Sequence, residues 1–332
     1  MNMSDLKHSV VGNPKEMFVL VLHNGAIITA EDRAMLQALY SRSPASIFTH
    51  LSKLAEAGSG KFMDTFYVGY AHKSIGDCGD TTIFIENVSM LVAKAVQDWM
   101  LYNGQEVSTR YVDFATQPFV NPLGLADAEN PQEMLRKFYL KALPALKIDL
   151  KRRYPIQTDE KEGVYDKAIS ARAFDILRGF LPAGAHTNLA WTGNLRQMAD
   201  KIAYLRVHPL FEVREVARMA LEALQQAHPH SFGQKLYPAS EEYRAKYMMQ
   251  DYYFNPDFMR DEVRLTRNSL DTGLQMLYQR VIDSRPDKTE LPKALAEIGQ
   301  IQFEFTLDFG SFRDIARQRA VIQRMPLLTP KL

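Results

Sequence analysis

A polar segment near residue 106 carries residue types that suit an anionic ligand. Residues 106–111 read Glu-Val-Ser-Thr-Arg-Tyr and follow a stretch with helical spacing. Because alternate residues of an extended chain point the same way, Glu106, Ser108 and Arg110 would line one side. Arginine binds phosphate through two parallel hydrogen bonds, and serine adds a hydroxyl. The segment therefore suits a polar, phosphorylated ligand, although composition alone favours an ordinary solvated strand.

Two further segments have both a binding and a structural interpretation. Residues 191–196 read Trp-Thr-Gly-Asn-Leu-Arg, and Arg206 follows further along the same helical spacing. Asn194 suits the cap of the helix that begins there, and Arg196 and Arg206 would otherwise be surface residues. Residues 70–74 read Tyr-Ala-His-Lys-Ser, for which an ordinary loop is the alternative.

Several common sites are excluded by their spacing. Residues 58–61 read Gly-Ser-Gly-Lys, but the glycine and hydroxyl residue that complete a phosphate-binding loop are replaced by Ala55 and Phe62. The chain has no three-glycine dinucleotide fingerprint, no His-Glu-x-x-His and no paired cysteines, so no metal site is expected. Cys78 is flanked by carboxylates, which would raise the pKa of its thiol.

Composition excludes some classes of protein. The chain has 332 residues, with 40 basic and 39 acidic side chains. This balance argues against a protein that coats nucleic acid or an anionic membrane. No apolar run reaches the length of a membrane span, and the first 16 residues lack a signal pattern. With a single cysteine, no internal disulfide can form, so a reducing, cytoplasmic setting is expected.

Hydrophobic spacing predicts a helix-rich chain with two or three strands. Strands are expected at 17–22, 80–86 and 301–307, although the first could also be a buried helix segment. Residues 115–131 are expected to form a loop. Helices are expected at 31–56 (broken at Ser43-Pro44), from Val88 to about Asn103, and at 132–150, 165–180, 195–208, 213–224, 237–258, 260–283 and 289–299. A basic helix that carries Arg313, Arg317, Arg319 and Arg324 is expected near the end of the chain. The predicted class is α+β, with a small antiparallel or mixed sheet flanked by helices.

Taken together, the polar segments resemble the flavin-dependent thymidylate synthase family. That family has Glu-Leu-Ser-x-Arg-Tyr around a serine, to which residues 106–111 are similar. Its Gly-His-x-Ser/Thr resembles residues 71–74, and its Arg-x-x-Leu-Pro resembles residues 178–182. Its Trp-Thr-x-Asn-x-Arg resembles residues 191–196, and its later helix arginine is similar to Arg206 after a one-residue insertion. The segments stand in the family's order.

One departure from the family concerns its hallmark Arg-His-Arg, which precedes the serine by seven residues. Those positions hold Asp98-Trp99-Met100 here, whereas Arg317-Gln318-Arg319 near the end of the chain is close to Arg-His-Arg. Residues 83–91 and 304–312 also align weakly, each predicted as strand, turn and helix. The chain thus resembles the first unit, and the opening of a second, of a tandem form.

The tandem interpretation divides the chain into three parts. Residues 1–232 would form the family unit, 233–300 a helical connector, and 301–332 the start of a second, truncated unit. One unit would then supply the nucleotide-binding Ser-x-Arg, and the other the flavin-binding arginines. This would require a homo-oligomer or pairing with a second unit.

The resemblance implies a reaction as well as a fold like that of thymidylate synthase-complementing proteins. The family methylates deoxyuridine monophosphate (dUMP) to dTMP, with methylenetetrahydrofolate as carbon donor and FAD reduced by NADPH. The cofactor carries the difficult step, so no protein nucleophile is needed. Two alternatives stay open: a related flavoenzyme acting on another pyrimidine or folate substrate, and a degenerate nucleotide-binding subunit without flavin chemistry.

The resemblance also assigns roles to individual residues. Arg206 would stabilise negative charge on the pyrimidine ring. The other dUMP-binding residues would be Glu106, Val107, Ser108, Thr109, Arg110 and Arg178. The residues bordering FAD would be His72, Ser74, Glu106, Asn194, Leu195, Arg196, Asp200, Arg317, Gln318 and Arg319. Asp200 fits this set poorly, since an acid near the flavin phosphates would repel them.

Overall fold

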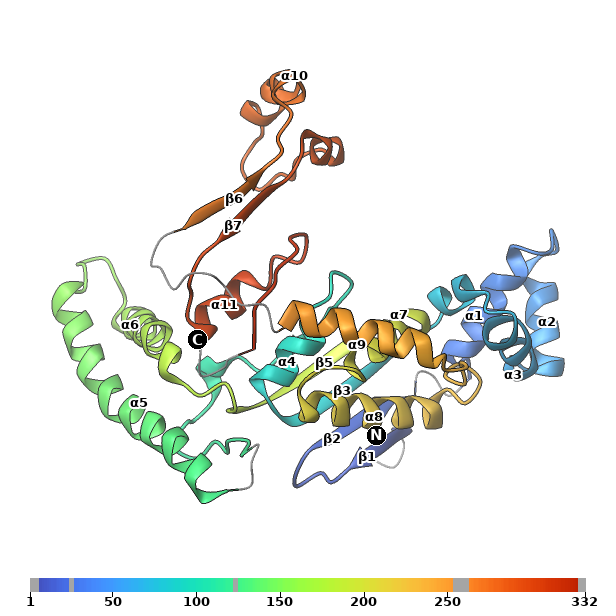
Figure 1. Cartoon of the computed structure of the whole chain (residues 1–332), viewed down its shortest axis with the longest axis horizontal. Helices are drawn as coiled ribbons and strands as arrows, with labels where there is room; N and C mark the ends of the chain where they lie inside the picture. Colours follow the sequence, from blue (N-terminus) through green and yellow to red (C-terminus); the bar gives the residue numbers. More distant parts are fainter. Residues whose placement is uncertain (1–5, 24–26, 122–124, 253–262, 328–332) are drawn as a thin grey trace. The chain divides into compact units, whose positions relative to one another are not determined.

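The computed structural model describes residues 6–23, 27–121, 125–252 and 263–327. It distinguishes a larger unit, residues 1–254 with 309–327, from a smaller unit, residues 255–308 with 328–332. The segment 309–327 therefore returns to the larger unit after the chain has passed through the smaller one (Figure 1). The division at 232 and 300 expected from the tandem form stays a prediction.

A five-stranded antiparallel sheet forms the centre of the larger unit. Its strands, in spatial order, are β1 (His8–Gly12), β2 (Phe18–Leu22), β3 (Asp80–Ser89), β5 (His186–Asn194) and β4 (Asn103–Glu106). Val19 and Val21 of β2 and Ile83 and Ile85 of β3 are fully buried, while the residues between them are half-buried. This alternation gives the sheet one strongly apolar face.

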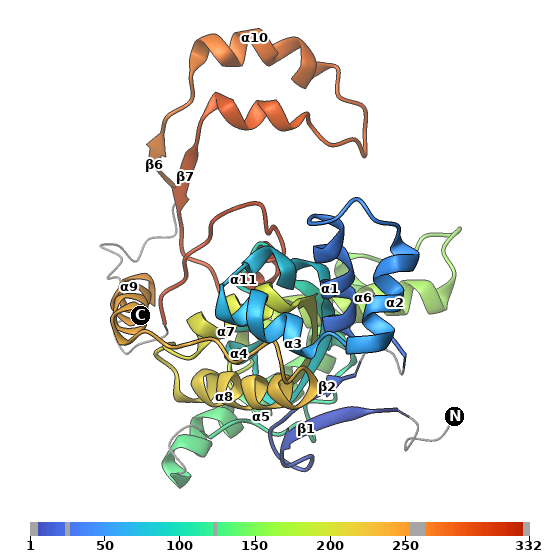
Figure 2. The same ribbon diagram turned by 90° about the vertical axis from the view of Figure 1, so that its right-hand side faces the viewer.

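Helices cover that apolar face. Figures 1 and 2 show α8 running along β1 and β2, and the cores of α4, α7 and α8 join the buried residues of the sheet in one cluster. The helices of the larger unit are α1 (Ala30–Tyr40), α2 (Ile47–Ala57), α3 (Gly60–Phe62), α4 (Met90–Gln97), α5 (Ala126–Arg153), α6 (Glu162–Leu177), α7 (Leu195–Leu205), α8 (Phe211–Ala227), α9 (Pro238–Tyr252) and α11 (Phe309–Ile315). A π-helix, η2 (Met63–Gly69), and three 3-10 turns, η3 (Lys73–Cys78), η4 (Thr109–Tyr111) and η5 (Arg178–Phe180), complete it.

The junction between β3 and α4 is fixed by hydrogen bonds. A bulge between Ile85 and Val88 places Asn87 in the left-handed region, at a φ of 58°. Ser89 then caps α4, because its hydroxyl oxygen accepts from the Val92 amide at 3.2 Å. Glu212 of α8 accepts from both the amide and the hydroxyl of Ser89, at 2.8 and 2.6 Å. The direction of α4 is therefore set by the sheet and by α8 together.

The structure confirms the α+β class and the strands predicted at 17–22 and 80–86. It also confirms the break between α1 and α2. Other predictions for the larger unit are wrong. The sequence predicts no strand at β1 or β5, and the helix expected from Val88 to about Asn103 is limited to α4. α5 begins at Ala126 inside the expected loop, and the expected basic helix near the end of the chain ends at Ile315. The recurring arginines predict a longer helix there, whereas short turns follow Ile315.

The described part of the smaller unit contains a pair of strands, an α-helix and a 3-10 segment. Strand β6 (Arg264–Asn268) pairs antiparallel with β7 (Ile301–Glu304), and α10 (Thr272–Asp283) packs on the 3-10 segment η6 (Lys293–Ile298). The helix expected at 260–283 is wrong for residues 264–268, which form β6, whereas residues 272–283 form α10. Residues 260–262 lie outside the described residues. The expected helix at 289–299 is a shorter 3-10 segment. β7 is not half-buried as predicted, since Ile301 and Phe303 are 46% and 53% exposed.

Among the described residues, no helix is both long enough and apolar enough to cross a membrane.

Candidate functional site

Glu106 lies at the end of β4, where three other elements bring side chains to its carboxylate. β4 pairs with β5, which places Thr187 beside it, and the Thr187 hydroxyl donates to Glu106 at 3.2 Å. Gln97, the last residue of α4, donates its amide at 2.7 Å. Arg313 of α11 forms an ion pair with the same carboxylate. Glu106 is only 13% exposed, so its charge is held by partners rather than by water.

Beside Glu106, arginines and carboxylates alternate in a chain of ion pairs. Arg110 donates to both oxygens of Asp175, at 3.3 and 2.6 Å. Arg178 lies 3.8 Å from Asp175 and also pairs with Asp314 of α11. Arg317 reaches the other oxygen of Asp314 at 3.6 Å. We call these five residues the arginine cluster.

The arginine cluster draws on segments far apart in the sequence. Arg110 lies in η4 after β4, Asp175 and Arg178 lie at the end of α6 and in η5, and Asp314 and Arg317 lie in and after α11. Ser108 caps η4, its hydroxyl oxygen accepting from the Arg110 amide at 3.4 Å. The structure therefore brings the predicted Ser108, Arg110 and Arg178 to one place.

Charge and burial suit the cluster to an anion. Burial raises the pKa of Asp314, but the hydrogen bond from Arg178 and the charges of Arg178, Arg317 and Arg110 outweigh it and hold the pKa below its usual value. Arg178 is 16% exposed, and its Nε is buried without a hydrogen-bond partner among the residues that the structure describes. A buried donor of this kind is costly unless a ligand or water accepts from it.

The two neighbours of Ser108 contribute mainly through the backbone and packing. The Val107 amide donates to the Asn188 carbonyl at 2.9 Å, which extends the pairing between β4 and β5. The Val107 side chain is 39% exposed, whereas Thr109 is buried. Their predicted contact with a nucleotide stays a prediction.

The residues assigned to the flavin form a second group around the start of α7. Asn194 caps α7, accepting from the Gln197 amide at 2.8 Å, and Leu195 is fully buried in the core. Arg196 donates to Asp77 at 2.7 Å, and Lys73 donates to Asp200 at 3.4 Å. Both pairs join α7 to η3. Asp200 is thus balanced by a lysine.

His72 and Ser74 lie at the same end of α7, next to η2. The imidazole of His72 stacks with Tyr70 and Phe66, at ring-centroid distances of 6.0 and 6.3 Å. Arg42 donates to its Nδ1 at 3.2 Å. The carbonyl of Ser74 accepts weakly from the Cys78 thiol at 3.7 Å. This region presents aromatic rings and cations side by side.

Arg206 lies apart from both groups. It follows the last residue of α7, about 18 Å along the axis from the capping residue at the start of that helix. Its guanidinium donates to Glu241 of α9 at 2.9 Å, and Glu241 also accepts from Arg244 at 2.7 Å. The structure therefore directs Arg206 toward α9 and does not bring it to the arginine cluster within this chain.

The positions of the family's Arg-His-Arg serve packing here. Asp98 lies 3.9 Å from Lys94, and its carbonyl accepts from the buried Lys201 at 2.8 Å. The Lys201 Nζ also lies 5.5 Å from the Trp99 ring. Met100 is 65% exposed. None of these three side chains carries a positive charge that a flavin phosphate would need.

The side chains of Arg317 and Arg319, which resemble the two arginines of Arg-His-Arg, lie in different surroundings. Arg317 belongs to the arginine cluster, whereas Arg319 lines a shallow pocket of about 500 Å³ with Met100, Asn103 and Gln197. The carbonyl of Gln318 accepts from the Gln323 side chain at 3.3 Å. Arg319 therefore lies near Met100, one of the positions that hold the family's Arg-His-Arg, and near the start of α7. Arg317 lies in the arginine cluster instead.

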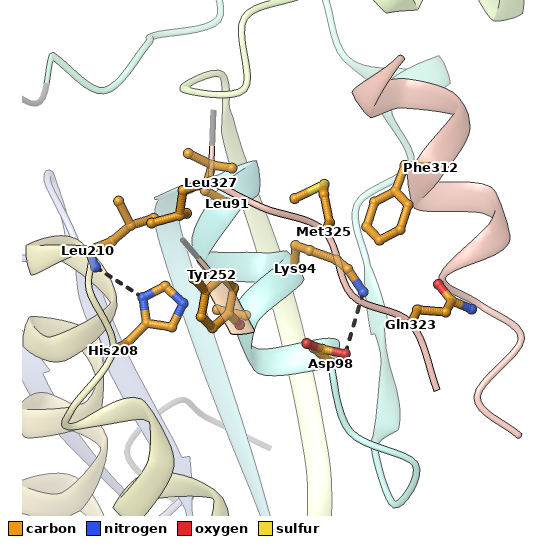
Figure 3. Close-up of a pocket in the computed structure, with 11 residues that line it drawn as sticks. Leu91, Lys94, Asp98, His208, Leu210, Tyr252, Phe312, Gln323, Met325 and Leu327 are labelled. Carbon is orange, nitrogen blue, oxygen red and sulfur yellow. Dashed lines mark hydrogen bonds and ion pairs between the residues drawn. The ribbon is translucent and has the colours of Figure 1, made fainter. Parts of the chain in front are cut away.

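The C-terminal segment is held against α4 by an apolar contact. Figure 3 shows Phe312, Met325 and Leu327 around a cavity of about 20 Å³, with Lys94 beneath Phe312. The Lys94 Nζ lies 5.0 Å from the Phe312 ring, and the Leu327 amide donates to the Tyr252 carbonyl at 2.9 Å. Burial lowers the pKa of Lys94, against the opposing charges of Asp98 and Glu106. This contact fixes α11 beside Glu106.

Sequence reasoning missed the residues that complete the site. Gln97, Asp175, Arg313 and Asp314 were not singled out, although each contacts a predicted residue. Asp175 carried a faint signal, since it precedes Arg178 by one helical turn. Cys78 behaves as predicted: burial and the nearby Asp77 and Asp80 raise the pKa of its thiol. The described residues include no group of three or more potential metal ligands.

Comparison with known proteins identifies one matching family and several relatives. The model of the family described as thymidylate synthase complementing protein matches residues 28–230. A UPF0159 protein of Chlamydia muridarum is 26% identical over 79% of this chain and 60% of its own length. A UPF0159 protein of Chlamydia pneumoniae is 23% identical over 78% and 59%, and one of Thermoplasma acidophilum is 24% identical over 89% and 74%. This chain thus spans about 60% of the length of the chlamydial relatives.

The family match covers β3 to β5, α7 and α8, and it includes Glu106, Arg110 and Arg178. It therefore extends over most of the sheet and the first part of the arginine cluster. The chain belongs to the thymidylate synthase complementing protein family.

Proposed function

We propose that this protein is a flavin-dependent thymidylate synthase, which converts dUMP to dTMP by reductive methylation at C5. Methylenetetrahydrofolate would supply the carbon, and FAD reduced by NADPH would supply the hydride. The observation that carries the proposal is the convergence of Ser108, Arg110 and Arg178 beside the buried Glu106. This set offers guanidinium groups and a hydroxyl to a phosphate, as a nucleoside monophosphate requires.

Within the proposal, each residue of the site has a distinct task. Ser108, Arg110 and Arg178 bind the substrate phosphate, and Asp175 orients Arg110 for this contact. Glu106 orients the substrate through the hydrogen bonds that fix its own carboxylate. Arg206 stabilises negative charge that develops on the pyrimidine ring. Because Arg206 is directed toward α9 in this chain, it would serve the nucleotide of a second copy or a second unit, so we propose an oligomer.

The residues at the start of α7 fit FAD in their chemistry. Lys73 and Arg196 are 64% and 39% exposed, so they are accessible to its phosphates, and Arg319 adds a third cation nearby. The stacked His72 and Tyr70 suit a flat ring system. FAD bound there would accept and donate the hydride, while the protein orients the nucleotide and neutralises its charge.

A second function is favoured by the side chains at positions 98–100. Asp98 and Trp99 pack against Lys94 and Lys201, so the family's flavin-binding arginines are replaced by structural residues. A subunit that binds the nucleotide without flavin chemistry would have this feature. The two functions differ in whether FAD is retained.

The first test is the visible absorption spectrum of the purified chain after incubation with FAD and desalting. Retained flavin gives bands at about 370 and 450 nm. The proposal predicts these bands, and it predicts that they weaken in an Arg196→Ala variant but persist in Arg152→Ala, a change on the exposed end of α5. Absence of the bands in the unchanged chain would favour the nucleotide-binding subunit.

A further inference from the structure

Helix α11 lies outside the residues that match the family, yet it supplies charged groups to the site. Arg313 pairs with Glu106, and Asp314 pairs with Arg178. These two neighbouring residues bind two different parts of the candidate site. The cation–π contact between the Lys94 ammonium and the Phe312 ring holds the helix in the same place (Figure 3). The C-terminal segment, residues 309–327, therefore lines one side of the site.

The charged side chains of the site favour the binding of an anion. The site contains four guanidinium groups and three carboxylates, which leaves one positive charge in excess. They are Arg110, Arg178, Arg313 and Arg317, and Glu106, Asp175 and Asp314. The buried Nε of Arg178 is an additional donor that has no hydrogen-bond partner in the described part of the chain. An anion with several acceptor oxygens would satisfy both the charge and the donor.

Arg317 is placed to take part in binding such an anion. Its Nη2 lies 3.6 Å from one oxygen of Asp314, while Arg178 holds the other oxygen. One carboxylate therefore keeps two guanidinium groups side by side. The Arg317 side chain is 74% exposed, so it can turn toward a ligand at little cost, whereas Arg178 is largely buried. A phosphate would accept from both groups and carry more charge than the carboxylate.

We infer that Arg317 is a further phosphate-binding residue of the nucleotide site, acting beside Arg178. The inference rests on the proposed function for the identity of the nucleotide. It moves Arg317 from the flavin, where resemblance had placed it, to the phosphate of dUMP. Arg319, which lies at the pocket with Met100 and Gln197, keeps its place near the flavin.

The test is calorimetric titration of the full chain and of Arg317→Ala with four ligands: dUMP, deoxyuridine, inorganic phosphate and FAD. We expect Arg317→Ala to weaken binding of dUMP and inorganic phosphate about tenfold, as for loss of one charged hydrogen bond. Binding of deoxyuridine and FAD should stay unchanged. The matched control is Arg324→Ala, an exposed arginine of the same segment that lies 3.9 Å from Asp251.

The other outcomes distinguish an error in the role of Arg317 from an error in the proposed function. If Arg317→Ala weakens FAD and leaves dUMP unchanged, the inference is wrong and Arg317 serves the flavin. If dUMP binds equally well to all three proteins, the inference is wrong while the proposed function stands. If phosphate binding depends on Arg317 but dUMP does not bind, the phosphate contact is supported and the proposed function is wrong. If no ligand binds, both are wrong.

Discussion

Two buried histidines make the stability of the larger unit depend on pH. His208 and His228 are each 2% exposed. Burial, followed by the charges of Lys201 and Arg214, lowers the pKa of His208 to about 4. Burial, followed by the charges of His23 and Arg33, lowers that of His228 to about 4. Both imidazoles are therefore neutral in the folded protein at neutral pH.

The sign of the effect follows from these pKa values. In the unfolded chain each histidine titrates near 6.5, so between pH 6.5 and 4 the unfolded state binds more protons. The contribution of these two histidines to the free energy of unfolding should be nearly constant above pH 7.5 and fall below pH 6.5, by about 2 kcal/mol per histidine at pH 5. In His228→Gln the loss between pH 7.5 and 5 should shrink by about that amount, measured by urea unfolding, and in the exposed His8→Gln it should not. Parallel pH curves for all three proteins would contradict this prediction.

At the candidate site, residue types were predictable and partners were not. Ser108 and Arg110 stood out because a hydroxyl and a guanidinium can both donate to a phosphate, although composition alone favoured a solvated strand. Arg178 stood out only through the resemblance to the family. Asp175 and Asp314 did not, because a single aspartate on a helix is common and no spacing in the sequence relates it to a distant arginine. Only the fold brings α6 and α11 to the end of β4.

At the scale of elements, strand β4 depends on one glycine. Gly104 faces the Ala190 carbonyl of β5 and the Tyr102 hydroxyl, and a Cβ at this position would overlap both. The Tyr102 hydroxyl in turn donates to that carbonyl at 2.8 Å. A side chain at 104 would push β4 away from β5, and Glu106 follows two residues later.

We therefore expect Gly104→Ala to lower the free energy of unfolding by about 2 kcal/mol or more, because overpacking displaces a strand of the sheet. The same change should weaken dUMP binding at least tenfold, because Glu106 and Ser108 move with the strand. Gly163→Ala is the control, since a Cβ there meets nothing within 4 Å. Thermal unfolding and calorimetry of both variants check this, and equal stability of the two would show that β4 yields without cost.

The elements that sequence reasoning missed share a physical reason. Strand β5 alternates buried residues with half-buried or exposed ones from Thr187 to Gly193, but Gly193 and the polar Asn188 weaken its apolar pattern. Its place between β3 and β4 is set by pairing with distant residues. By contrast, α7 and α8 were predicted well, because their apolar residues recur at helical spacing within a single segment.

At the scale of the whole molecule, the two units differ in how much they bury. The larger unit has a continuous core that joins the sheet to α1, α4, α7 and α8. In the described part of the smaller unit, Ile298 is the only buried apolar residue, and Leu265, Met276, Leu277 and Phe303 are all more than half exposed. The alternation of apolar and polar residues at 301–307 predicted strand β7 correctly, but it also predicted that one face would be buried. That face is exposed, because burial depends on which other elements pack against the strand.

The proposed reaction of this chain is the methylation of dUMP, and the formation of dTMP measures that reaction itself. The chain would be incubated with dUMP, methylenetetrahydrofolate, FAD and NADPH, and the products separated by chromatography. We expect dTMP from the unchanged chain and from Arg324→Ala, and a loss of at least a hundredfold in Arg178→Ala, because this change removes the largely buried guanidinium that we propose as a phosphate ligand. Absence of dTMP from the unchanged chain with bound flavin, or its undiminished formation by Arg178→Ala, would show that the proposal is wrong.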